Sequence, residues 1–133
     1  MKNFLAVTLL LTAAAACAAH SANRWSKDDR GVLLSIARAP IRTRAWKNPY
    51  EGQPEALEAG EKLFHQHCAE CHGENARGLG HAANLRLPDV QNATPGELAW
   101  LLRNGNLAAG MPSWSGLPAE RRWQIVAYVK SLR

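Results

Sequence analysis

The pentapeptide Cys68-Ala69-Glu70-Cys71-His72, near the middle of the 133-residue chain, constrains the fold and chemistry more than any other feature. Two thiols three positions apart, followed directly by an imidazole, form the C-x-x-C-H pattern. In this pattern the thiols add across the two vinyl groups on one edge of a porphyrin, and the adjacent imidazole ligates the iron. The sequence therefore predicts one covalently attached haem c, with Cys68 and Cys71 as attachment points and His72 as an iron ligand.

Two other uses of these residues are less well supported. A redox-active C-x-x-C pair is expected after a strand, in a βαβ setting that this sequence lacks. A structural zinc ion needs four ligands. His65, His67 and His81 are near the motif in sequence, but their spacing fits no usual zinc finger.

Met111 is the predicted second axial ligand of the iron. The chain has two methionines, and Met1 is expected to leave with the signal peptide described below. Met111 follows Gly110 and precedes Pro112, in a stretch between two predicted helices, and a loop methionine held in this way suits a fixed ligand. The alternatives are a gap-filling methionine and ligation by His81.

Residues 1–22 are predicted to form a secretory signal peptide. Lys2 gives a basic start, Phe4 to Ala16 is a short apolar run, and small residues follow. This run is shorter than the roughly 20 apolar residues that a membrane-spanning helix needs, so a retained anchor is the less favoured alternative. We therefore expect the protein in the periplasm.

The fate of Cys17 depends on where cleavage occurs. Ala14-Ala15-Ala16-Cys17 resembles a lipoprotein signal, in which the cysteine is lipidated and becomes the first residue of a membrane-anchored protein. Ordinary cleavage a little further on, which we favour, would discard Cys17.

Residues 23–53 are predicted to form a basic N-terminal arm. Seven basic and three acidic residues from residue 18 to residue 53 give this part a net charge of +4, whereas residues 54–133 hold eight of each sign. A short helix is expected from Gly31 to Ala39, with Val32, Leu33 and Ile36 on one side, and Pro40 would stop it. We expect a solvated arm that packs on the surface of the domain and is not needed for the fold. The alternative is a docking surface for an acidic partner or an anionic membrane.

Three helices are predicted in residues 54–133. The first begins at Pro54, the second runs from Thr94 to Asn104, and the third runs from Pro118 to about residue 132. Thr94 and Glu97 form a capping box for the second helix. No alternating pattern predicts a strand. A domain of about 80 residues buries little apolar surface, so a haem among the helices would supply much of the core.

The stretch from about Pro54 to Arg133 resembles a class I cytochrome c domain. The matching segments are Gly60 to Phe64 before the C-x-x-C-H motif, Gly110-Met111-Pro112, and Trp123 to Val129. It is most similar to the small mono-haem domains found in oxidase subunits and beside quinoprotein dehydrogenases. The resemblance implies an all-α cytochrome c fold, with three main helices around one haem c, here extended at the N-terminus. It also implies that Gly60 and Phe64 contact Ile125 and Tyr128.

The resemblance suggests further residues around the haem. A proline carbonyl usually accepts the hydrogen bond from the free nitrogen of the ligating histidine, and Pro88 resembles that proline. Trp114 is expected against the haem, near Met111 or a propionate, with plain core packing as the alternative. Arg77, Arg86 and Arg103 are candidate partners of the propionates.

A histidine and methionine pair leaves no open position for a substrate, so the expected function is electron transfer, not catalysis. The donor would be a periplasmic dehydrogenase or reductase, and the acceptor an oxidase or another cytochrome complex. No nucleic-acid partner is expected. The alternatives are a permanently bound subunit of a dehydrogenase or oxidase, and a haem enzyme or gas-binding protein with an open sixth site.

Overall fold

The computed structural model describes residues 27–133, with side-chain surroundings from residue 31 onward. The elements are helices α2 (Lys27–Ala37), α3 (Pro54–His67), α4 (Ala69–His72), α5 (Pro88–Asn92), α6 (Pro95–Asn104) and α7 (Ala119–Ser131), with the 3-10 helices η1 (Ile41–Ala45) and η2 (Leu107–Ala109). The only strand-like pairing in this part of the chain is a single bridge between Asn106 and Met111. The all-α prediction is confirmed. The predicted signal peptide and Cys17 lie outside the described residues.

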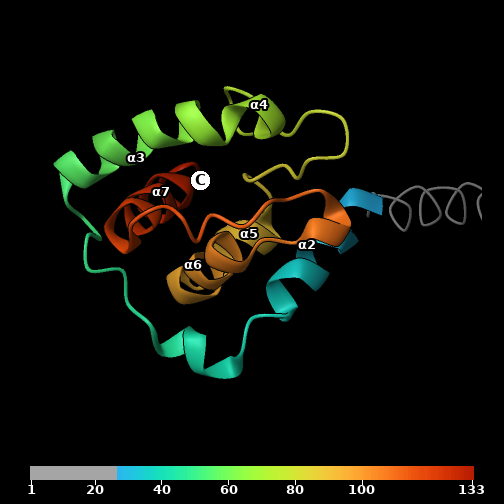
Figure 1. The fold of residues 1–133 in the computed structure, drawn as a ribbon, viewed down its shortest axis with the longest axis horizontal. Helices are drawn as coiled ribbons and strands as arrows, with labels where there is room; N and C mark the ends of the chain where they lie inside the picture. Colours follow the sequence, from blue (N-terminus) through green and yellow to red (C-terminus); the bar gives the residue numbers. More distant parts are fainter. Residues whose placement is uncertain (1–26) are drawn as a thin grey trace, which may run out of the picture.

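Helices α3 and α7 make the most extensive contact between two elements of the described fold, and Figure 1 shows α7 lying beneath α3. At Gly60 the two backbones approach so closely that an added Cβ would lie 2.0 Å from the carbonyl oxygen of Gln124. Phe64, which is wholly buried, packs against Tyr128 with 5.3 Å between the ring centroids. The predicted contact between the first and last main helices is confirmed, and it explains a glycine in the middle of a helix.

The ends of the helices follow the capping residues in the sequence. Thr94 is the N-cap of α6, and its hydroxyl accepts a hydrogen bond from the N–H of Glu97 while the Glu97 carboxylate accepts one from the N–H of Thr94. Gly105, at a φ of 68°, ends α6. The first predicted helix is divided, because Cys68 separates α3 from the single turn of α4. No helix among residues 27–133 is long and apolar enough to cross a membrane.

The segment before α3 packs against the rest of the fold, and a few of its side chains are buried more deeply than the expected packing on the domain surface. Ile36 belongs to the core and Thr43 is fully buried. An added Cβ on Gly96 of α6 would lie 1.9 Å from the Thr43 carbonyl oxygen. Asn48 donates a hydrogen bond of 2.9 Å to the carbonyl of Trp123 in α7. In Figure 1 this segment runs along α6 before it reaches α3.

The inward face of α2 differs from the predicted one. Ser35 and Ile36 are buried and Val32 packs against the core, whereas Leu33 is 46% exposed. Residues 32, 35 and 36 lie at helical steps of three and four, so they share one face. Helix α2 packs this face against α5 and α6, and Leu33 lies outside it.

Candidate haem-attachment site

A single helical turn gathers the C-x-x-C-H side chains. The N–H groups of Cys71 and His72 both bond to the carbonyl of Cys68, at 3.2 and 2.9 Å. Positions three and four apart lie on one side of a helical turn, so the turn brings both thiols and the imidazole to the same side. Both cysteines are free; Cys68 is buried and Cys71 is exposed.

Burial, and to a smaller extent the neighbouring Cys71, raise the pKa of the Cys68 thiol to about 11. The Cys68 thiol is therefore protonated at neutral pH. Thiol–disulfide exchange depends on a thiolate, whose pKa is lowered in redox-active C-x-x-C pairs. The environment of Cys68 thus argues against a dithiol redox function for this motif.

The two ring nitrogens of His72 have different surroundings. Nδ1 lies 2.8 Å from the carbonyl oxygen of Ala83. A carbonyl only accepts hydrogen bonds, so Nδ1 carries the proton in the neutral ring and Nε2 keeps its lone pair. A lone pair on Nε2 is what an iron ligand requires, and the carbonyl fixes the orientation of the ring.

The carbonyl partner of His72 corrects the prediction for Pro88. Pro88 is exposed and begins α5, whereas Ala83 lies eleven residues after His72 in the preceding loop. The loop brings Ala83 to the imidazole because it folds back on the motif. The N–H of Gly78 bonds to the His72 carbonyl at 2.8 Å, and the N–H of Leu79 bonds to the Cys71 carbonyl at 2.9 Å.

The other histidines near the motif do not form a metal site with it. Among residues 27–133, no three His, Cys, Asp or Glu side chains lie together in a way that would hold a metal ion. The ring of His65 lies 2.5 Å from the carboxylate of Glu74, His67 packs against Trp114, and His81 is exposed. Two free thiols beside one oriented imidazole suit covalent haem, which brings its own iron and four nitrogens.

Met111 ends a short closed loop after α6. Asn106 and Met111 exchange two backbone hydrogen bonds, of 2.9 and 3.0 Å. An added Cβ on Gly105 would lie 2.6 Å from the carbonyl of Pro112, so the two ends of the loop touch. The Met111 side chain is half-buried and packs against the core. The expected loop setting of Met111 is thus present, while its role as a ligand stays a prediction.

Trp114, which follows the Met111 loop, contacts both α6 and the last residue of α3. Its N–H bonds to the Leu102 carbonyl at 3.0 Å, and its ring lies 5.3 Å from the ring of His67, between centroids. Because His67 precedes Cys68, this contact links the Met111 loop to the attachment turn. Asn106 and Ala83 are the two residues of the site that the sequence analysis missed.

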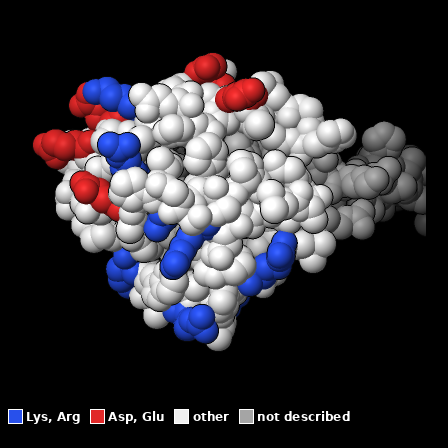
Figure 2. All heavy atoms as spheres, in the orientation of Figure 1, with Lys and Arg blue, Asp and Glu red and all other residues white. Residues whose placement is uncertain are grey.

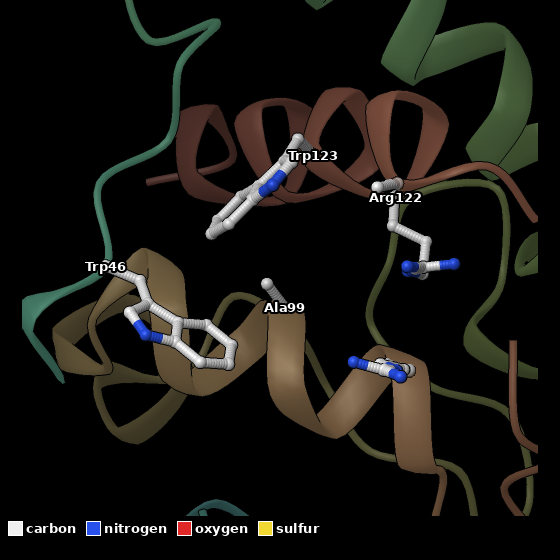
Figure 3. A pocket seen from close by; sticks show the side chains of 6 residues that line it. Trp46, Ala99, Arg122 and Trp123 are labelled. Atoms are coloured by element: carbon white, nitrogen blue, oxygen red, sulfur yellow. The ribbon is translucent and has the colours of Figure 1, made fainter. Parts of the chain in front are cut away.

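The candidate arginines have different surroundings. Arg86 donates to the carbonyls of Asn75 and Leu132, so backbone groups already engage it. Arg77 is exposed. Arg103 lines a pocket of about 170 Å³ with Trp46, Ala99, Ala119, Arg122 and Trp123 (Figure 3). Apart from Arg103, none of the predicted haem-binding residues lines this pocket.

A helical fold built around a C-x-x-C-H turn, with a single oriented histidine, defines a class I c-type cytochrome. Residues 55–129 match the family described as cytochrome c oxidase, cbb3-type, subunit III. The chain belongs to this family of c-type cytochromes, which are electron-transfer haem proteins with covalently bound haem c.

Several known proteins are similar to this chain. It is 31% identical to the quinohemoprotein alcohol dehydrogenase ADH IIB of Pseudomonas putida over 80% of this chain and 16% of that protein. It is 31% identical to cytochrome c550 of Pseudomonas aeruginosa over 68% of this chain and 65% of that protein. It is 39% identical to the cbb3-type oxidase subunit CcoP of Rhodobacter capsulatus over 43% of this chain and 20% of that protein.

A solved structure shares the fold. Cytochrome cL from the marine methylotroph Methylophaga aminisulfidivorans MPT superposes with a TM-score of 0.55 at 29% identity. The match covers 62% of this chain and 57% of that one. This chain therefore spans less than two thirds of each of these four proteins.

Proposed function

We propose that this protein carries one electron at a time on a single haem c ligated by His72 and Met111. The observation that carries the proposal is the orientation of His72, whose Nδ1 is bonded to the Ala83 carbonyl and whose Nε2 is left as the ligand. Bound haem c supplies a one-electron couple. Cys68 and Cys71 would hold it covalently, and His72 and Met111 would be the two protein ligands of its iron.

This ligand set explains why we propose a carrier and not an enzyme. With two protein ligands, the iron would have no open position for a substrate or a gas molecule. Peroxidases and gas-binding haem proteins need an open position instead. Met111, held by Gly105, Asn106 and Pro112, argues against that alternative.

A permanently bound subunit is the second candidate, and one observation favours it. The chain matches only 16% of the quinohemoprotein dehydrogenase and 20% of CcoP, so similar domains occur within larger proteins. Such a subunit would use the same haem and the same ligands. Size-exclusion chromatography of the protein from its own cells separates the two cases, because a free carrier elutes near 14.6 kDa or a little below.

We propose a periplasmic location and redox-protein partners, with residues 1–22 as the export signal. On the face in Figure 2, acidic residues gather over α3 and α4, and basic residues lie mostly over the opposite side. The N-terminal segment contributes exposed basic side chains, among them Arg38, Arg44 and Lys47. We propose that this side attracts an acidic partner or an anionic membrane. Cell fractionation tests the location, and loss of electron-transfer rate with added salt tests the attraction.

Met111→Ala tests the proposed ligand directly. The oxidised wild-type protein is expected to show the weak far-red charge-transfer band of a sulfur–iron bond. In the variant this band should disappear, cyanide and carbon monoxide should bind readily, and the reduction potential should fall, because a thioether favours the reduced iron. Visible spectroscopy and a potentiometric titration measure these changes.

Met111→His is the matched variant, because it keeps a protein ligand on the iron. It should remain closed to carbon monoxide but also show a lower potential than wild type. If wild type and Met111→Ala give the same far-red spectrum, Met111 does not bind the iron, and His81 becomes the leading candidate.

A further inference from the structure

Asn106 uses all four of its polar groups, and they connect two parts of the molecule. Its backbone N–H and C=O bond to the backbone of Met111, at 2.9 and 3.0 Å. Its side-chain oxygen accepts a hydrogen bond of 2.9 Å from Nη1 of Arg38. Its side-chain nitrogen donates one of 2.7 Å to Oγ of Ser35. Asn106 therefore joins the Met111 loop to the N-terminal segment.

The chemistry of the partners fixes the orientation of the Asn106 amide. Arg38 only donates, so the amide atom beside it must be the oxygen. The hydroxyl of Ser35 donates to the Gly31 carbonyl at 2.7 Å, which leaves its oxygen to accept from the amide nitrogen. A flipped amide would set two donors against each other at Arg38. The arrangement is thus specific for an asparagine at this position.

Few other contacts hold the tip of this loop. None of the residues of η2 is buried, and Leu107 is 80% exposed. Gly110, which precedes Met111, is also exposed. Apolar burial therefore stabilises the tip little, and the hydrogen bonds of Asn106 account for much of its order. Figure 1 shows the loop beside α2, in keeping with the hydrogen bonds of Asn106 to Ser35 and Arg38.

We propose that α2 is a positioning element for the iron ligand: Ser35 and Arg38, acting through Asn106, hold the Met111 loop closed over the haem. This inference rests on the proposed function, in which Met111 is the ligand. It gives the N-terminal segment, which precedes the family match at residues 55–129, a role in keeping the haem iron inaccessible to small molecules.

The test compares cyanide binding to the oxidised holoproteins of wild type and of the Asn106→Ala, Ser35→Ala and Arg38→Ala variants. Cyanide must wait for Met111 to leave the iron, so its binding rate reports how often the loop opens. Loss of both side-chain hydrogen bonds of Asn106 should raise this rate about three- to tenfold in Asn106→Ala, and by less in the other two variants, each of which removes only one of these two bonds. Arg38→Lys, which keeps a donor, should restore part of the wild-type rate.

Two control variants separate the positioning of the Met111 loop from the effects of lost charge and lost stability. Arg42→Ala removes an equal charge from an exposed position on the same segment, and should leave the rate unchanged. Gly60→Ala should lower the melting temperature through the α3–α7 crossing without raising the cyanide rate. Hydrogen exchange of the Met111 amide gives a second readout that needs no assumption about the ligand, and it should be faster in Asn106→Ala.

The outcomes distinguish this inference from the proposed function. If wild type shows the far-red band, but the cyanide rate and Met111 exchange are unchanged in Asn106→Ala, the inference is wrong and the proposed function stands. Acceleration by Arg42→Ala equal to that by Arg38→Ala would also overturn it, since charge and not the hydrogen bond would be responsible. If wild type lacks the band, the proposed ligand and the inference built on it both fail.

Discussion

At the scale of single residues, Glu97 shows how much one side chain can contribute to the stability of the fold. One carboxylate oxygen accepts hydrogen bonds from the N–H and the hydroxyl of Thr94, at 2.9 and 3.0 Å. The other accepts a bond of 2.7 Å from Nε of Arg44, and the side chain is only 8% exposed. Burial acts to raise the pKa of Glu97, but the hydrogen bonds from Thr94 and Arg44 together lower it below the ordinary value.

Glu97→Gln should therefore destabilise the protein in a pH-dependent way. The pKa of Glu97 is lower in the folded state than the unfolded value of about 4.3, so its stabilisation is present above that pH and is lost as the pH falls through the folded pKa. At pH 7 the variant should lose about 1–3 kcal/mol of unfolding free energy, and the difference from wild type should shrink below about pH 4. Urea denaturation at several pH values measures this.

Glu61→Gln, at an exposed position on α3, is the matched control and should change stability little. A difference between wild type and Glu97→Gln that stays constant from pH 7 to pH 3 would contradict the assignment, because it would show that the charge of Glu97 is not involved.

The residues of the site differ in how far the sequence reveals them. Cys68, Cys71 and His72 are identified by spacing alone, because covalent haem attachment demands that spacing. The carbonyl that orients His72 was assigned to the wrong residue. Every residue has a carbonyl, so only the path of the loop decides that Ala83, and not Pro88, meets the imidazole. Asn106 was missed because its partners are 68 and 71 positions away in the chain.

At the scale of elements, caps and periodicity identified the three main helices well. The capping box at Thr94 and the stop at Gly105 are both present. The face of α2 was harder to predict, because Val32, Leu33, Leu34 and Ile36 are all apolar and several faces fit the pattern. Packing against α5 and α6 decides between them, and it buries Ser35 while leaving Leu33 and Leu34 exposed.

The crossing of α3 and α7 makes a clear prediction for Gly60→Ala. Alanine is the better helix former by roughly 1 kcal/mol, so an uncrowded site would gain stability. Here the added Cβ would lie 2.0 Å from the Gln124 carbonyl, which forces the helices apart. The variant should lose about 1–3 kcal/mol and show a lower melting temperature by circular dichroism.

Gly31→Ala is the matched control, because Gly31 also lies in a helix but has no atom within 4 Å of an added Cβ. It should leave the melting temperature unchanged or raise it. Equal effects of the two substitutions would mean that the close approach at Gly60 is absent in solution.

At the scale of the whole molecule, charge was a poor guide to packing. The basic segment differs from the rest of the chain in charge, and this difference suggested a separate arm. Yet the same segment contributes Ile36 to the core, buries Thr43 against α6 and ties Asn48 to α7. The charged side chains of this segment are exposed, whereas its buried side chains make the packing contacts. One segment can therefore be basic at the surface and packed against the core. The boundary at residue 53 stays a prediction.

The small core explains why the cofactor matters to the molecule as a whole. A domain of this size buries limited apolar surface, and the two cysteines form no disulfide between them. Covalent haem would be attached to the turn of α4 and would pack against the residues around it. Through Met111 it would also connect α4 to the loop after α6. We therefore propose that Cys68 and Cys71 hold haem through covalent bonds and that these bonds complete the fold.

Haem retention after denaturation tests this claim most directly. The purified holoprotein is extracted with acidified organic solvent, and the protein is then run on a denaturing gel and stained for haem. We expect the haem to stay with the wild-type polypeptide and to be absent from the polypeptide of the Cys68→Ala, Cys71→Ala double variant. Release of the haem from the wild-type protein into the organic phase would contradict it.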